Sequence, residues 1–175
     1  MGQYKCSIIC VALMLSSGYA SAATVAAAYP SGTLNVTGTV LDKGCTINAK
    51  DYVIQLPPMV NTAFTAAGDM GEKSTAVPFT LTDCPTGRTM SFIVTGTVGS
   101  NANTFKIDAG TSKATGVDII LYNGTSIVRP NFSHTLTLDS SGNYASTFSA
   151  MLRSNAASVT AGAVDTVVTY TLAYN

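Results

Sequence analysis

The stretch GAVDTVVTYTLAYN (residues 162–175) decides the fold that this sequence predicts. Every second residue along it is apolar, aromatic or β-branched, while most of the residues between are smaller or more polar. This period of two indicates a β-strand with one buried face. The stretch also has no proline to remove a ladder donor. We therefore expect a strand that begins at Gly162 and has the following inward residues: Val164, Thr166, Val168, Tyr170, Leu172 and Tyr174.

A strand that runs to the last residue, Asn175, needs a cover. Chain ends fray unless something ties them down, and an uncovered strand edge promotes aggregation. Two arrangements satisfy this need. The strand is either fully paired within its own sheet, as in complete sandwiches, or covered by a segment from elsewhere.

The first 22 residues have the pattern of a secretory signal peptide. Lys5 supplies a positive charge, residues 7–15 (SIICVALML) form an apolar run too short to cross a bilayer, and residues 20–22 (ASA) are small. We expect cleavage after Ala22, which removes Cys6 and Cys10 and leaves an exported chain of about 153 residues.

The two remaining cysteines, Cys45 and Cys84, favour a disulfide over a metal site or a catalytic thiol. An even number of cysteines in an exported chain is typical of disulfide bonding. A disulfide between them would close a loop of about 40 residues, which stabilises the folded state by about 4 kcal/mol by the chain-entropy estimate.

Residues 23–42 precede this pair and end in a second alternating run, GTLNVTGTVLD (residues 32–42). One face of the run carries Leu34, Val36, Gly38 and Val40, and the other carries threonine and asparagine. A glycine inside a strand marks either a β-bulge or the close approach of another chain segment. Both interpretations of Gly38 are open on the sequence alone.

The remainder, residues 43–175, predicts one domain built from short strands. Turn residues such as Asn123-Gly124 and DSSG (residues 139–142) separate alternating runs about ten residues apart, which indicates an antiparallel β-sandwich. Residues 59–67 fit either a helical turn or an irregular crossing segment. The expected strands before the terminal one are residues 45–47, 52–56, 77–81, 90–94, 105–107, 117–122, 127–128, 135–138 and 144–152.

Several functional classes find no support in the sequence. The single histidine, His134, lacks nearby partners for catalysis or metal binding, and the carboxylates are scattered through turns. No G-x-S-x-G elbow or phosphate loop is present, and N-x-[ST] sequons at Asn35, Asn123 and Asn131 are expected by chance in a Thr-rich chain. Without Lys5 the chain carries eight basic and nine acidic side chains, and this nearly even balance does not favour binding to nucleic acid. We expect no enzyme, no cofactor and no metal.

The cysteine pair, the run GTLNVTGTVLDKGC (residues 32–45) and the terminal stretch together carry a family resemblance. A glycine fourteen residues from the C-terminus, alternating apolar residues and a penultimate tyrosine form the terminal motif, which Gly162 and Tyr174 match. With its signal peptide, the chain resembles a pilin subunit of the bacterial chaperone-usher pathway, and is most similar to structural subunits of type 1-like fimbriae.

This resemblance implies an immunoglobulin-like sandwich that lacks its seventh strand and is completed by a donated strand. The residues from Gly162 to Tyr174 would border the acceptor groove, and the run from Leu34 to Val40 would be the donor for a neighbouring pilin subunit. The carboxylate of Asn175 would anchor the subunit to a periplasmic chaperone before an outer-membrane usher exports it. The implied product is a surface fimbria that supports adhesion. The alternative function is a carbohydrate-binding tip adhesin or an adaptor.

Overall fold

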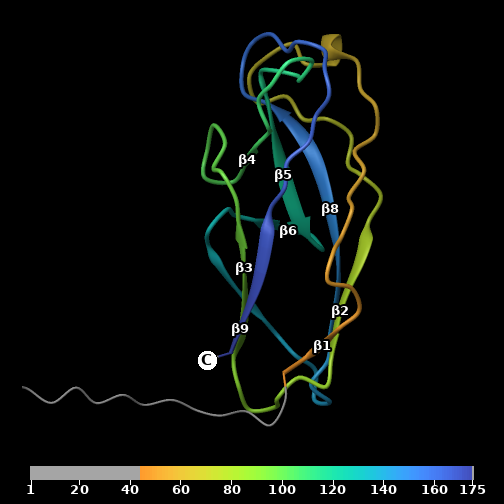
Figure 1. The fold of residues 1–175 in the computed structure, drawn as a ribbon, viewed down its shortest axis with the longest axis vertical. Coiled ribbons are helices and arrows are strands. Elements are labelled where there is room, and N and C mark those ends of the chain that lie inside the picture. Colours follow the sequence, from red (N-terminus) through yellow and green to blue (C-terminus); the bar gives the residue numbers. More distant parts are fainter. Residues whose placement is uncertain (1–43, 175) are drawn as a thin grey trace, which may run out of the picture. The chain divides into compact units, whose positions relative to one another are not determined.

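The computed structural model describes residues 44–174, and these residues form an all-β domain (Figure 1). The prediction of an all-β fold is therefore confirmed. One 3-10 turn, η1, occupies Asn61–Ala63, and within the described residues no helix is long and apolar enough to cross a membrane. The strands are β1 (Thr46–Ile47), β2 (Val77–Thr82), β3 (Met90–Thr95), β4 (Phe105–Lys106), β5 (Val117–Asn123), β6 (Ser126–Val128), β7 (Ser133–Leu136), β8 (Tyr144–Ser154) and β9 (Thr169–Tyr174).

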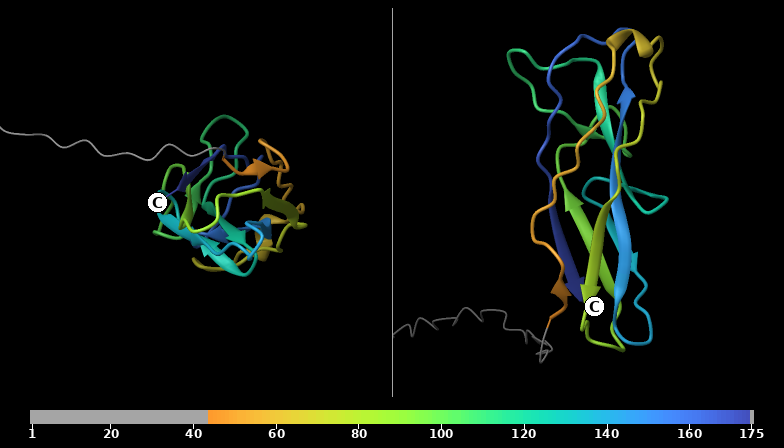
Figure 2. Two further views of the ribbon diagram at one scale, coloured as in Figure 1. Left: turned by 90° about the horizontal axis from the view of Figure 1, so that it is seen from below. Right: turned by 90° about the vertical axis from the view of Figure 1, so that its right-hand side faces the viewer.

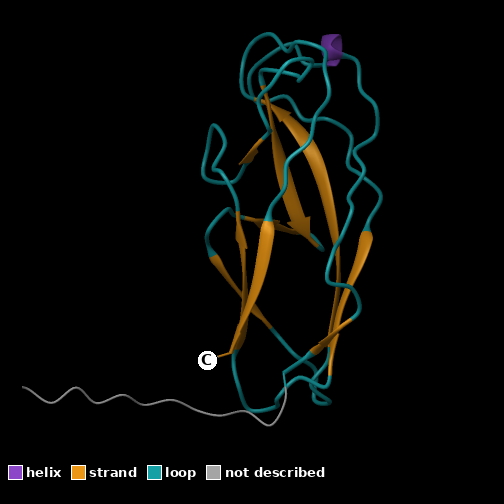
Figure 3. Ribbon diagram, viewed as in Figure 1, coloured by secondary structure: helices purple, strands orange, loops and turns teal. Residues whose placement is uncertain are grey.

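The strands make two antiparallel sheets that pack face to face (Figures 1 and 3). One sheet has the order β1-β2-β8-β5-β4, with β6 paired to β5, and the other has the order β7-β3-β9. Strands β7 and β9 are therefore the opposite edges of the smaller sheet. The long partnership of β5 with β8 and that of β3 with β9 form the centres of the two sheets.

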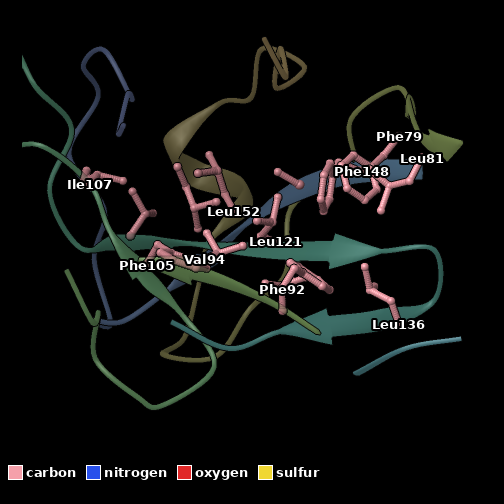
Figure 4. Close-up of a cluster of buried hydrophobic side chains, with 14 of the residues drawn as sticks. Phe79, Leu81, Phe92, Val94, Phe105, Ile107, Leu121, Leu136, Phe148 and Leu152 are labelled. Atoms are coloured by element: carbon pink, nitrogen blue, oxygen red, sulfur yellow. The ribbon is translucent and has the colours of Figure 1, made fainter. Parts of the chain in front are cut away.

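Alternating apolar residues from both sheets form the core (Figure 4). The rings of Phe79 and Phe148 lie 4.9 Å apart within the larger sheet, and the ring of Phe92 crosses from the smaller sheet to within 6.1 Å of Phe148. Each such side chain contributes about 1.5 to 3 kcal/mol when fully buried. The prediction of a sandwich, made from the alternation alone, is confirmed.

Turn chemistry sets the connections where the sequence indicated it. Asn123 and Gly124 form the hairpin between β5 and β6, where Gly124 has a φ of 60° that favours glycine. At residues 139–142 the carbonyl of Asp139 accepts a hydrogen bond from the amide of Gly142 at 3.0 Å. Both predicted turns are confirmed.

Most predicted strands match the structure to within two residues at each end, and two differ by more than that. Residues 52–56 alternate between half-buried and exposed side chains but belong to no strand, because no neighbouring strand of the described part offers them a ladder. The terminal strand is shorter than predicted, since only Thr169–Tyr174 pairs with β3. Residues 59–67, left open by the sequence, contain the η1 turn. The signal peptide, the run from Leu34 to Val40 and Asn175 lie outside the described residues.

Candidate strand-binding groove

The edge of β9 that faces away from β3 is unpaired. Within residues 44–174, β9 forms a ladder with β3 alone, and β1 is likewise the last strand of its own sheet. An edge strand presents a row of free backbone N–H and C=O groups that can pair with another strand. These two edges belong to different sheets and lie on the same border of the sandwich, as the tyrosine contacts described below establish.

Two rows of half-buried apolar side chains line this border. They pack against the core but are not fully covered by residues 44–174, which is why their exposure is intermediate. We call the space between the rows the β1/β9 groove. Its first row is Ile47, Tyr52, Ile54, Leu56 and Met59, and its second row is Val164, Val168, Tyr170, Leu172 and Tyr174.

The alternation predicted for the terminal stretch holds in the structure, although half of it is not a ladder strand. The predicted inward residues, including Thr166, are half-buried, and Asp165, Val167, Thr169 and Thr171 between them are exposed. Figure 2 shows this part of the chain in blue alongside the orange segment that follows β1. The residues expected to border an acceptor groove therefore do share one face.

A pocket of about 310 Å³ lies at one end of this border. Its lining includes Leu56, Met59, Phe64, Val159 and Val164. The predicted site residue Gly162 also lines it, for a steric reason: a Cβ at that position would lie 2.4 Å from the backbone nitrogen of Ala114. No side chain fits there, so glycine lets the chain pass close to the neighbouring loop.

Tyrosine hydroxyls join the two rows at the other end. The hydroxyl of Tyr170 donates to the carbonyl of Lys50 at 3.0 Å, and the amide of Cys45 donates to the hydroxyl of Tyr174 at 2.9 Å. Burial raises the pKa of Tyr170, and the nearby Tyr52 and Asp51 raise it further. The hydroxyl of Tyr170 therefore keeps its proton and acts as a donor. Side-chain contacts replace a backbone ladder between these borders.

The disulfide predicted between Cys45 and Cys84 is present. It joins the start of the first row to the end of β2, where the amide of Cys84 donates to the carbonyl of Gly142 at 3.0 Å. The groove border next to β1 is thus covalently tied to the larger sheet.

The polar residues that the sequence singled out have structural roles. The Nε2 atom of His134 accepts a hydrogen bond from the amide of Arg129, and the amide group of Asn131 exchanges two bonds with the backbone of Gly96. Within residues 44–174 no three His, Cys, Asp or Glu side chains gather as metal ligands. The side-chain amide of Asn123, the other sequon asparagine within the described residues, donates to the hydroxyl of Tyr144.

Sequence reasoning missed the first row of the groove as a functional border. The alternation of Tyr52, Ile54 and Leu56 is the available signal, but alternation alone predicts an ordinary paired strand. No sequence pattern predicts the hydrogen bonds between the hydroxyls of Tyr170 and Tyr174 and the backbone of residues 45–50. These bonds join positions about 120 residues apart in the chain.

The fold and the groove define a class of β-sandwich protein whose exposed feature is an unpaired sheet edge. Comparison with known proteins narrows this class. A family model described as fimbrial protein matches residues 34–175, so the chain belongs to the fimbrial protein family. Its members are structural subunits of cell-surface fimbriae, and the chain is a pilin and not an enzyme.

Individual relatives agree with this assignment. The chain is 29% identical over 169 residues to the major fimbrial subunit SMF-1 of Stenotrophomonas maltophilia (strain K279a), covering 89% of this chain and 99% of that protein. Among solved structures, it resembles a chaperone-usher pilus subunit with a TM-score of 0.59 (22% identity, 83% of this chain, 96% of the other). It also resembles the P pilus rod subunit PapA with a TM-score of 0.58 (20% identity, 76% of this chain, 100% of the other). These structural likenesses confirm the immunoglobulin-like pilin fold.

Proposed function

We propose that this pilin polymerises by donor-strand exchange, in which the β1/β9 groove receives a strand from another subunit. The observation that carries the proposal is the outer edge of β9, which has no backbone partner within residues 44–174 and lies beside two rows of half-buried apolar side chains. An inserted strand would gain main-chain hydrogen bonds along that edge and would cover both rows.

The proposed donor is the alternating run of a neighbouring subunit. Its inward face would consist of Leu34, Val36, Gly38 and Val40. Burying the three larger side chains would contribute about 5 to 9 kcal/mol. Each added ladder hydrogen bond contributes about 1 kcal/mol. A non-covalent contact of this size supports a long-lived fibre.

The same groove would also serve the delivery of the subunit to the fibre. A periplasmic chaperone would occupy it first and would hold the carboxylate of Asn175, and an outer-membrane usher would then exchange the chaperone for the next subunit. The signal peptide proposed for residues 1–22 would direct the chain to the periplasm. The name of the major fimbrial subunit to which the chain is 29% identical supports a place in the fibre shaft. Deleting the gene should then remove the fibres from electron micrographs, whereas an adaptor would alter only their length or adhesion.

The decisive experiment uses the two faces of the donor run. A peptide of residues 31–42 is mixed with the chaperone-bound subunit, and displacement of the chaperone is followed over time. Val36→Asp should abolish exchange because it puts a charge on the face to be buried, and Thr37→Asp, on the opposite face, should leave exchange nearly unchanged. Equal rates for both variants would contradict the proposal. A subunit that lacks residues 23–42 should bind the chaperone but not extend a fibre.

A further inference from the structure

The smaller sheet has one side in the core and one side directed outward. Met90, Phe92 and Val94 of β3 are buried in the core, so the residues that alternate with them point to the opposite side, together with their partners on β7 and β9. We call this side the outer β3 face. It runs from Ser133 and Thr135 on β7, across Ile93 and Thr95 on β3, to Thr169 and Thr171 on β9.

The outer β3 face carries no charged side chain. Strands β3, β7 and β9 contain no Lys, Arg, Asp or Glu, and His134 stacks on Phe92 on the core side of the sheet. The outward side of the larger sheet is different, because Asp118 and Arg153 are paired there across β5 and β8. The two outward sides of the sandwich therefore differ in charge.

Most of this face is open to solvent in the described part of the chain. The five serine and threonine side chains that define it are exposed, Ile93 at its centre is half-buried, and Ser91 in the next row is buried. Val167 continues the face beyond β9 and is 87% exposed. Soluble proteins usually carry charged side chains on exposed sheet positions, and these charges keep copies apart. An uncharged face of this kind favours contact with another surface.

Charged groups lie at the rim of the face. Asp165 forms an ion pair with Lys113, and the guanidinium of Arg129 lies 4.7 Å from the ring centre of Phe132, the residue before β7. An uncharged centre with a charged rim is typical of protein interfaces. The donor strand proposed above would lie beside β9 and would widen the centre, because its outward residues are also uncharged: Thr33, Asn35, Thr37 and Thr39.

A second copy of the same face is the partner that this surface fits. A charged surface would lose the hydration of its charges on contact and would find no counter-charge here. Of the two outward sides of the described sandwich, only the outer β3 face is uncharged, so its match is itself. A face that packs against itself makes a two-fold contact, whereas the subunits along one fibre follow each other head to tail. The second copy therefore belongs to another fibre.

We propose that the outer β3 faces of two neighbouring fibres pack together and join the fibres side by side. This contact rests on the fibre formation proposed above. The two sheets would lie about 10 Å apart, with Ile93 of each copy near the centre of the contact. A single contact of this kind is weak, but its repetition along both fibres would raise the avidity by orders of magnitude. The expected assembly is a bundle of fibres.

The test compares fibres of the exported chain by electron microscopy and by low-speed sedimentation, in which bundles pellet and single fibres do not. Thr171→Asp and Thr171→Lys each put like charges into the contact, so each should reduce the pelleted fraction about tenfold. A mixture of the two kinds of fibre should pellet as the unaltered fibres do, because opposite charges then face each other. Thr82→Asp is the matched control, since Thr82 is exposed on β2 of the larger sheet, and its fibres should pellet normally.

Failure of this contact can be told apart from failure of fibre formation. If the unaltered chain forms no fibres, the function proposed above is contradicted. The two Thr171 variants are then compared as exported subunits by sedimentation equilibrium, where their mixture should form dimers that neither variant forms alone.

The bundling proposal is overturned if unaltered fibres stay single, if Thr171→Asp fibres pellet as unaltered fibres do, or if the mixture of the two variants stays unbundled. Loss of coiling within single fibres, with bundling unchanged, would assign the outer β3 face to contacts along one fibre and would also overturn it. The formation of fibres by each variant shows that its subunits are folded.

Discussion

The backbone amide of Cys45 donates a hydrogen bond to the hydroxyl of Tyr174 at 2.9 Å, although 129 residues separate them. Gly44 leaves room for this contact, since a Cβ there would lie 3.1 Å from the hydroxyl oxygen. Cys45 is also held by its disulfide to Cys84, and Tyr174 is held by its pairing with Met90. The penultimate tyrosine therefore fixes the start of the first groove row to β9.

Removing this hydroxyl should destabilise the domain. Tyr174→Phe leaves the Cys45 amide without its acceptor in a partly buried position, and we expect a loss of about 1 to 2 kcal/mol in the free energy of unfolding. Urea denaturation measures it. The matched control is Tyr122→Phe, whose hydroxyl donates only to the sulfur of Met151, a weak acceptor. Equal losses in the two variants would show that the contact with Cys45 is unimportant.

Loss of the disulfide should lower the free energy of unfolding by more than the loss of the Tyr174 hydroxyl does. The bridge closes a loop of 39 residues, and replacing both Cys45 and Cys84 by alanine should lower the free energy of unfolding by about 4 kcal/mol. Urea denaturation of the double variant, compared with the reduced unaltered chain, separates the bridge from the loss of the sulfur atoms. A loss below about 1 kcal/mol would mean that the bridge does not restrict the unfolded chain.

A buried carboxylate at the start of β5 holds two loops in place. Asp118 is 2% exposed and accepts hydrogen bonds from the amide of Ser100 at 2.7 Å, the hydroxyl of Thr104 at 3.2 Å and the side-chain amide of Asn155 at 2.9 Å. Asp118→Ala strands these donors, so we expect a loss of about 2 to 4 kcal/mol. The exposed Asp165, whose partner is Lys113, is the control, and its replacement by alanine should cost less than about 1 kcal/mol.

Local patterns in the sequence predicted the fold well. Alternation located β2, β3, β5 and β8, and the Asn123-Gly124 signal located a hairpin, because both depend on neighbouring residues. The terminal stretch shows the limit of the pattern. Its alternating burial from Val164 to Tyr174 was correct, but the ladder begins only at Thr169, since pairing depends on where β3 ends.

The site was predicted in part. The sequence indicated the second row of the groove, whose members share one strand-like stretch. It did not indicate the tyrosine contacts or the first row, because distant segments create them. The strand predicted over residues 52–56 was wrong: these residues pair with no strand of the described part, and their apolar face lines an open border. The buried Asp118 also has no sequence signature, because its donors come from two loops that are far apart in the sequence, the β3–β4 loop with Ser100 and Thr104 and the loop after β8 with Asn155.

Acid should weaken the turn before β8. The amide of Asn143 donates to the carboxylate of Asp139 at 2.8 Å, and this bond lowers the pKa of Asp139, with a further contribution from the amide of Ser141. A lowered pKa in the folded state stabilises the fold at pH values above the usual carboxyl range, and this stabilisation is lost as the pH falls through the lowered value. Asp139→Asn should therefore reduce the Tm at pH 7, and the difference should vanish in acid. A difference in Tm that persists in acid would contradict this role of Asp139.

Filling the groove pocket should block assembly without unfolding the subunit. Val164 is half-buried and lines the pocket of about 310 Å³, so Val164→Trp places a large ring where a donated strand would insert a side chain. Val167 points away from the groove and is 87% exposed, which makes Val167→Trp a control of the same size change in the same stretch. Chaperone-bound subunits of both variants are mixed with a peptide of residues 31–42, and exchange is followed by native electrophoresis. We expect at least tenfold slower exchange for Val164→Trp and a normal rate for Val167→Trp, because only the first competes for the volume that the strand must occupy. If Val164→Trp exchanges at the normal rate, the pocket is not part of the strand-binding site, and the donor must end before it reaches Val164.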